Sequence, residues 1–205
     1  MTRFLIIFLG ALATVLMSYT ALALLPSAQI ASVEPTKAAT NYNYMEARGR
    51  AIYMREGCIY CHTQQVRPEG FGSDIARGWG PRGSLPGDYV YDKTHLLGTM
   101  RTGPDLADIA SRQPSQAWHL AHLYQPRSVS PGSVMPAYPY LFEVKQKTNV
   151  LPSETTVNIS GPYAPTDGRV VVATEEALAL YEYLMTLKIP PRDNGAQNAA
   201  QGAMP

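Results

Sequence analysis

The sequence predicts a mainly α-helical chain, in which one N-terminal transmembrane helix precedes a single helical domain with loop and β-hairpin insertions. Three observations favour this fold class. Residues 4–25 form an apolar run without a charged residue. Apolar residues recur with helical spacing within residues 43–57 and 174–187. The 205-residue chain also contains 17 prolines and 16 glycines, which indicates that much of the chain between those helices is loop.

The first element is the run FLIIFLGALATVLMSYTALALL at residues 4–25. As a helix it spans roughly 33 Å, which matches a hydrocarbon core of roughly 30 Å, and Pro26 is expected to end it. A cleaved signal peptide is the alternative, although its apolar core usually has only about 7–15 residues. Arg3 precedes the run and no Lys or Arg follows before Lys37. The positive-inside rule therefore predicts that residues 1–3 are cytoplasmic and that the domain lies on the periplasmic side of a bacterial inner membrane.

The rest of the chain divides by composition. We expect a linker at 26–42, one domain at 43–191 and a disordered polar tail at 192–205. The domain carries two Gly- and Pro-rich stretches that a minimal helical domain does not need, at 68–101 and 143–173. A net charge of +1 gives no reason to expect a nucleic-acid partner.

The second helix is predicted at residues 43–57, and it leads directly into the sequence CIYCH. Cys58 and Cys61 are the only cysteines of the chain, and His62 follows them. A redox disulfide is one interpretation, but the βαβ pattern expected beside such a motif is absent. A zinc site would need further ligands, for which His119 and His122 are candidates.

The third interpretation is a covalently bound haem, because C-x-x-C-H is the attachment signature of c-type haem. Two thiols at this spacing can reach the two vinyl groups on one edge of the porphyrin, and the next residue then directs its imidazole to the iron. Cys58, Cys61 and His62 on the outer side of the membrane therefore favour a c-type cytochrome domain with one covalent haem c.

A second axial ligand is needed if the iron only transfers electrons, and methionine is the usual choice. Met135 is favoured because Pro131 and Pro136 stiffen its loop. Met185 lies in a predicted amphipathic helix, where core packing is the simpler role. A loop position of Met135 without iron contact, or ligation by a histidine, remains an alternative. The other candidate ligands are Met100, Met204, His119 and His122.

Two further groups are expected near such a haem. Gly103 and Pro104 begin a Gly-Pro-x-Leu turn, whose backbone carbonyl is expected to accept a hydrogen bond from the axial imidazole. Arg101 is a candidate partner of a haem propionate, since a guanidinium group can bind a carboxylate through two parallel hydrogen bonds. The alternative for Arg101 is a solvated surface position.

The remaining elements are a helix at 115–124, a short strand at 88–91 and a β-hairpin around residues 165–168. The last helix begins after Thr174 as its N-cap and ends before Pro190-Pro191. The first and last helices of the domain are expected to cross beside the haem.

Taken in order, the motifs resemble the membrane-anchored mono-haem subunit (subunit II) of cbb3-type cytochrome c oxidases. The resemblance covers residues 49–141 and the anchor, and it is carried by CHTQ, RTGPDL, WHLAHL and SVMPAY. It implies that Cys58 and Cys61 bind haem, that His62 and Met135 are its axial ligands, and that electrons pass from a donor cytochrome to a catalytic haem-copper subunit. The stretch GFGSDIARGWGPRGS and residues 143–173 depart from the family pattern.

The expected function is therefore electron transfer within a terminal oxidase, with the reduction of oxygen in another chain. Such a subunit is not an enzyme by itself, and its expected partners are the catalytic subunit, other cytochrome c subunits or a donor cytochrome, and membrane lipid. The alternatives are an electron-transfer subunit of a nitric oxide reductase, a membrane-tethered cytochrome shuttle, and a haem sensor or peroxidase.

Overall fold

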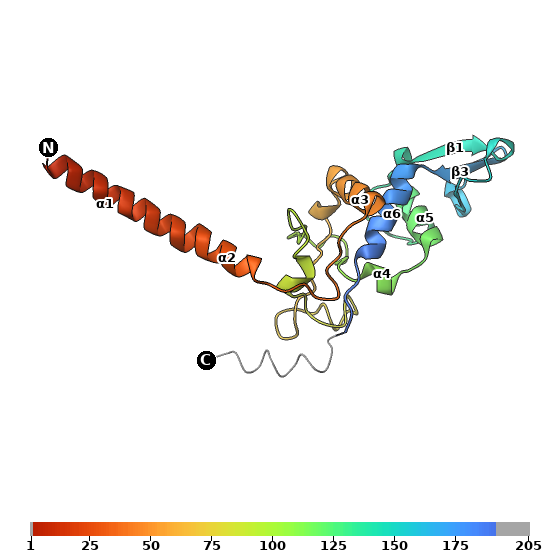
Figure 1. Cartoon of the computed structure of the whole chain (residues 1–205). Coiled ribbons are helices and arrows are strands. Elements are labelled where there is room, and N and C mark those ends of the chain that lie inside the picture. The colour runs from red at the N-terminus through yellow and green to blue at the C-terminus, as the bar shows by residue number, and fades with distance from the viewer. Residues whose placement is uncertain (1, 192–205) are drawn as a thin grey trace.

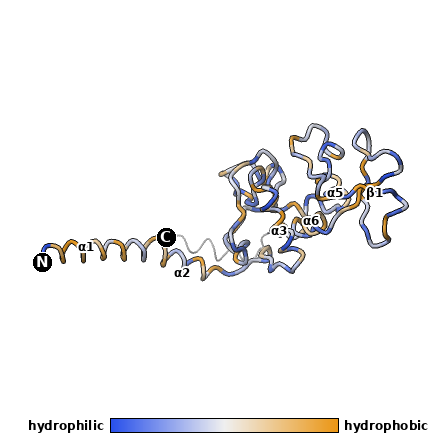
Figure 2. The backbone as a smooth tube through the Cα atoms, turned by 90° about the horizontal axis from the view of Figure 1, so that it is seen from above, coloured by the Kyte–Doolittle hydropathy of each residue, from blue (hydrophilic) through white to orange (hydrophobic). Residues whose placement is uncertain are grey.

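The computed structural model describes residues 2–191, and the predicted tail at 192–205 lies outside that range. A long N-terminal helix projects from a helical body, and a small sheet lies at the opposite end of the body (Figure 1). The helix is continuous from Thr2 to Ala31, and it is the one helix among the described residues that is long and apolar enough to cross a membrane. Apolar residues dominate its length (Figure 2).

The prediction that Pro26 ends this helix is wrong. Helix α1 (Thr2–Tyr19) passes into a π-helical segment (Thr20–Leu24), and α2 (Leu25–Ala31) continues with Pro26 in its first turn. Inside a helix proline is usually unfavourable for two reasons: it has no N–H to donate, and its ring clashes with a carbonyl group of the preceding turn. A π-helical segment widens the turn before proline and allows the chain to continue. The helical run is therefore longer than residues 4–25.

The body is built on the crossing of α3 (Tyr44–Arg55) and α6 (Glu175–Thr186), which lie side by side in Figure 1. The crossing is close because Gly49 has no side chain: a Cβ there would lie 1.8 Å from the carbonyl oxygen of Ala179. Tyr53 and Tyr183 are both buried beside it, with ring centroids 5.5 Å apart. The predicted crossing of the first and last helices of the domain is confirmed.

Local sequence explains where these helices begin. Asn43 accepts a hydrogen bond from the backbone N–H of Glu46, and Glu46 in turn accepts one from the N–H of Asn43. Thr174 accepts a hydrogen bond from the N–H of Ala177 at the start of α6, as predicted. Such caps satisfy N–H groups that have no partner inside the helix.

Two shorter helices complete the wall of the body: α4 (Ile109–Arg112) and α5 (Gln116–Tyr124), the latter with Ser115 as its N-cap. Short 3₁₀ helices punctuate the loops. They span Cys58–Tyr60, Pro86–Tyr89, Pro126–Ser128, Pro139–Leu141, Lys147–Asn149 and Gly161–Tyr163.

The sheet has three antiparallel strands in the order β1-β3-β2. The strands are β1 (Phe142–Gln146), β2 (Thr156–Val157) and β3 (Arg169–Ala173). Phe142 pairs with Ala173, and Val157 pairs with Val171. The predicted hairpin thus exists as β2 and β3, but its connection is a long loop. Strand β1 was not predicted.

The predicted strand at 88–91 is wrong, because the 3₁₀ helix Pro86–Tyr89 occupies its start. Asp88 is the physical reason. Its carboxylate accepts the N–H of Leu85 and two hydrogen bonds from the buried guanidinium of Arg82, at 2.9 and 2.8 Å. Thr36 in the linker also donates its hydroxyl to Asp88. These bonds fold the segment back on itself and join the linker to the body.

Candidate functional site

A large cavity opens between the segment that carries Cys58, Cys61 and His62, helix α5 and the loop that follows α5. Its volume is about 610 Å³, within the range of roughly 300–1,000 Å³ typical of small-molecule sites. Cys58, Cys61, His62 and Met135 all line it. The structure therefore brings the candidate haem residues, which lie up to 77 positions apart in the sequence, to one cavity.

The cysteine side of the cavity is a tight turn. Gly57 has a φ of 72°, a left-handed conformation that glycine adopts readily, and it leads from α3 into the 3₁₀ helix Cys58–Tyr60. Both thiols are free. Burial raises the pKa of Cys58 to about 12, which favours the neutral thiol over the thiolate that a redox-active C-x-x-C motif uses.

His62 is held from behind by the Gly103-Pro104 turn. Its Nδ1 lies 2.7 Å from the carbonyl oxygen of Pro104, and because a carbonyl only accepts, Nδ1 carries the proton. Burial lowers the pKa of His62 despite the opposing effect of that hydrogen bond. The imidazole is therefore neutral, which leaves Nε2 with a lone pair for a metal. Gly103 is needed here, since a Cβ would lie 2.2 Å from Cε1 of His62.

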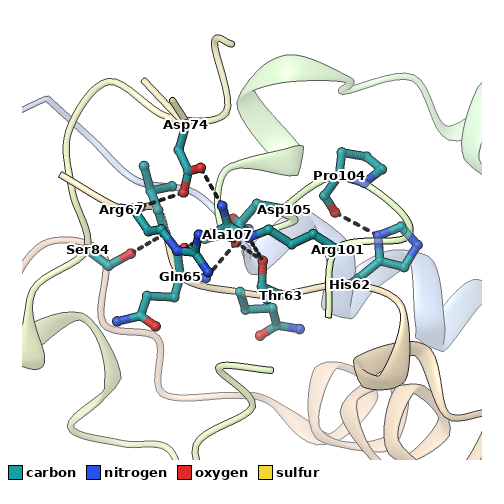
Figure 3. A network of polar contacts seen from close by, with 12 residues as sticks. His62, Thr63, Gln65, Arg67, Asp74, Ser84, Arg101, Pro104, Asp105 and Ala107 are labelled. Atoms are coloured by element: carbon teal, nitrogen blue, oxygen red, sulfur yellow. Dashed lines mark hydrogen bonds and ion pairs between the residues drawn. The ribbon is translucent and has the colours of Figure 1, made fainter. Parts of the chain in front are cut away.

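A polar network holds the two chain segments that meet at His62 (Figure 3). Asp105 is fully buried and accepts hydrogen bonds from the Thr63 hydroxyl at 2.5 Å, from the Gln65 N–H at 2.8 Å and from the Ala107 N–H at 2.8 Å. Thr63 follows His62, and Asp105 follows Pro104. One carboxylate thus joins the segment that carries the imidazole to the segment that backs it.

The structure places Arg101 in this network and not along the cavity. Its guanidinium binds the buried carboxylate of Asp74, donates to the Thr63 hydroxyl at 3.0 Å and donates to the carbonyl oxygen of Gln65 at 2.8 Å. Each of its three nitrogens therefore already donates to the protein, and a contact of Arg101 with a haem propionate stays a prediction.

Met135 lies on a loop with a defined turn. Ser133 donates its N–H to the carbonyl oxygen of Ser130, with Pro131 and Gly132 between them and a φ of 83° at Gly132. Proline followed by a glycine with positive φ is the pattern of a type II turn. Met135 packs partly buried against the core, so its thioether is presented by restrained backbone.

The other candidate methionines lie elsewhere. Met185 packs against the core from α6, and Met100 is 57% exposed. Neither lines the cavity, and Met204 lies outside the described residues.

His119 and His122 also line the cavity, from α5. Nε2 of His119 lies 2.8 Å from the carbonyl oxygen of Gln113, whereas Nδ1 of His122 is buried without a hydrogen-bond partner among residues 2–191. The sequence offered both residues as alternative iron or zinc ligands, or else as polar residues on the face of a helix. Among the described residues no group of three or more Cys, His, Asp or Glu side chains is close enough to hold a metal ion by itself.

The residues around the cavity suit a haem. Its lining is mostly apolar, and two free thiols, a neutral imidazole and the thioether of Met135 all belong to residues that line it. The missing Cβ at Gly103 leaves room for the His62 ring.

Comparison with known proteins identifies the family. The cytochrome c oxidase mono-heme subunit family, FixO, matches residues 2–187. The chain belongs to this family, and the resemblance to subunit II of cbb3-type oxidases is confirmed. A search of curated proteins found no match. As a member of the family the chain is a membrane-anchored subunit of an oxidase complex with one haem and with partner subunits.

Proposed function

We propose that this oxidase subunit binds one haem c through thioether bonds from Cys58 and Cys61, with His62 and Met135 as axial ligands. Its α1–α2 helix spans the bacterial inner membrane once, and its domain lies on the periplasmic side. It relays electrons from a donor cytochrome to the haem-copper catalytic subunit of a cbb3-type oxidase. The observation that carries this proposal is the single cavity on which both thiols, the backed imidazole and the loop thioether converge.

The protein's part in such a transfer is to hold the ligands still. When bound, haem supplies an iron that gains and loses one electron. The His62–Pro104 hydrogen bond fixes the imidazole plane, and the Ser130–Ser133 turn restrains the loop of Met135. If His62 and Met135 both held the iron, no coordination site would be left open for oxygen or another small ligand.

The complex itself is tested by mild purification of the chain from native membranes. Co-purification of an integral membrane subunit, spectra with c-type and b-type haem bands, and oxygen consumption are the expected results. A chain that carries one c-type haem without any partner would instead support the tethered shuttle. Carbon monoxide binding to the reduced haem of the chain would contradict the filled coordination and support a sensor or peroxidase.

The axial assignment is tested with two matched methionine variants of the full chain. Met135→Leu keeps the size of the side chain but removes the sulfur, and it should abolish the sulfur-to-iron charge-transfer band of the oxidised form. Met100→Leu makes the same change at an exposed residue outside the cavity and should leave the band intact. Persistence of the band in Met135→Leu would refute the assignment.

A further inference from the structure

Two segments that lie far apart in the sequence line much of the cavity. They are the cysteine segment, residues 56–62, and the methionine loop, residues 126–141. Within residues 2–191 one hydrogen bond joins these two segments directly: the hydroxyl of Tyr140 donates to Oε2 of Glu56 at 2.6 Å. This bond therefore links the part of the chain that carries the thiols to the part that carries the thioether.

The acceptor, Glu56, is held in place from its own side. Its side chain is only 10% exposed, and its Oε1 accepts a hydrogen bond from Nε of Arg55 at 2.7 Å. Its backbone N–H donates to the carbonyl oxygen of Ile52 at 2.8 Å, which continues the hydrogen bonding of α3. Gly57 and Cys58 follow it directly. The carboxylate is thus fixed to the turn that carries the first candidate haem thiol.

The donor, Tyr140, lies close to Met135 along a stiff stretch of chain. It comes five residues after Met135, and Pro136 and Pro139 restrict the backbone between them. Its ring also meets the ring of Tyr138 edge to face, with centroids 5.9 Å apart, and Tyr138 lines the cavity. The position of the Tyr140 hydroxyl therefore bears on the position of the thioether.

We propose that Glu56 and Tyr140 are positioning residues for Met135: their hydrogen bond holds the methionine loop against the cysteine segment and keeps the thioether on the haem iron. The inference rests on the proposed axial role of Met135. A carboxylate is a stronger acceptor than a neutral group, so the bond restrains the loop although Tyr140 is 63% exposed. Without it, the loop moves away more readily and the thioether leaves the iron more often.

The test measures how fast added imidazole replaces the thioether in the oxidised, haem-loaded full chain in detergent. One iron–sulfur bond breaks, one iron–nitrogen bond forms, and the iron keeps its oxidation state. At saturating imidazole the release of the thioether limits the rate, which is followed by the loss of the sulfur-to-iron charge-transfer band. The variants are Tyr140→Phe, Glu56→Ala and the two combined.

Tyr91→Phe is the matched control. Tyr91 is 49% exposed and lies outside the cavity, and its hydroxyl makes no hydrogen bond within residues 2–191. The control should bind imidazole at the rate of the wild type, because it removes a hydroxyl that joins no two segments of the described chain.

Tyr140→Phe should raise the rate about threefold to tenfold, as the loss of one hydrogen bond predicts. Glu56→Ala should raise it at least as much. The combined variant should be no faster than Glu56→Ala, because both changes remove the same bond. If Glu56→Ala retains too little haem, the comparison of Tyr140→Phe with the wild type decides.

A lower melting temperature of Tyr140→Phe with an unchanged imidazole rate would overturn the proposal, because the bond would then serve stability alone. Independent effects that multiply in the combined variant would also overturn it. Absence of the charge-transfer band in the wild type would instead refute the axial role of Met135 itself.

Discussion

Asp105→Asn is the most direct test of the network that holds the His62 site. The substitution keeps the shape of the side chain but replaces one carboxylate oxygen with an NH₂ group, which cannot accept. In the wild type the two oxygens of Asp105 accept three hydrogen bonds, from Thr63, Gln65 and Ala107. Whichever way the amide turns, at least one backbone or hydroxyl donor then faces another donor.

The magnitude follows from these contacts. A hydrogen bond to a charged acceptor contributes about 1.5–3 kcal/mol, and a buried donor left without a partner costs about 1–3 kcal/mol. The Thr63 hydroxyl can rotate to accept from the amide, so the loss is concentrated on one backbone N–H. We expect the free energy of unfolding to fall by about 3 kcal/mol, which lowers the melting temperature by roughly 6–12 °C in a domain of this size.

The assay is thermal and denaturant unfolding of the haem-loaded chain in detergent. Asp167→Asn is the matched control, because its carboxylate is 78% exposed and its ion pair with Arg169 is long, at 3.7 Å. That control should change the free energy by less than about 0.5 kcal/mol. A loss below about 1 kcal/mol in Asp105→Asn would show that the buried carboxylate does not join the two segments as argued.

Three other outcomes are expected. Gly87→Val should make the linker about tenfold more sensitive to protease, because a Cβ there would lie 2.5 Å from the carbonyl oxygen of Glu34; unchanged cleavage rates would contradict this. Burial raises the pKa of Asp88, but hydrogen bonds from the Arg82 guanidinium, the Thr36 hydroxyl and the Leu85 N–H outweigh that effect, so its pKa lies below the ordinary value. The ionised Asp88 carboxylate therefore contributes fully to the free energy of unfolding above about pH 4, and this contribution declines as the pH falls further. Between pH 6 and pH 3 the free energy of unfolding should consequently fall less in Asp88→Asn than in the wild type. Gly103→Ala should displace His62 and reduce the haem bound per chain; full haem content would refute the close contact.

Local sequence predicted the helices well because their signals are local. Asn43, Ser115 and Thr174 each accept a hydrogen bond from an N–H of the first turn, and such caps depend only on residues three or fewer positions away. The apolar periodicity of α6 likewise predicted a helical face, and that face is buried in the structure. These elements form wherever the rest of the chain lies.

Apart from Pro26, where the helix continues through a local π-helical segment, the errors in the predicted elements arose where distant residues decide the conformation. The segment at 88–91 looked like a strand, but Arg82 and Thr36 bind Asp88 and turn the chain there. Strand β1 forms because β3 pairs with it, and nothing near residue 142 signals that partner. Arg101, which the sequence offered as a partner of a haem propionate, donates to Asp74 in the structure, and the propionate contact stays a prediction. In each case the deciding partner could not be identified from local spacing.

His122 illustrates the same limit at the site. The spacing of WHLAH places two histidines on α5, but it does not say which one has a backbone partner. That distinction depends on the carbonyl of Gln113, which engages His119, and on the stacking that fixes His122 beside Trp118. A buried atom without a partner is visible only after the fold has assigned every other partner.

The hydrogen bonds between the linker and the domain favour a subunit of a complex over a tethered shuttle. A tethered shuttle needs a chain that lets its domain move away from the anchor, and its linker should make few bonds to the domain. Here Thr36 donates its N–H to the carbonyl oxygen of Gly87 at 3.0 Å and its hydroxyl to Asp88 at 2.6 Å, and Tyr42 donates to Asp92 at 2.9 Å. Asp88 is in turn paired with buried Arg82. These bonds hold residues 36–42 of the linker against the insertion at 68–101. A linker held in this way suits transfer to a partner in the same complex better than diffusion between partners.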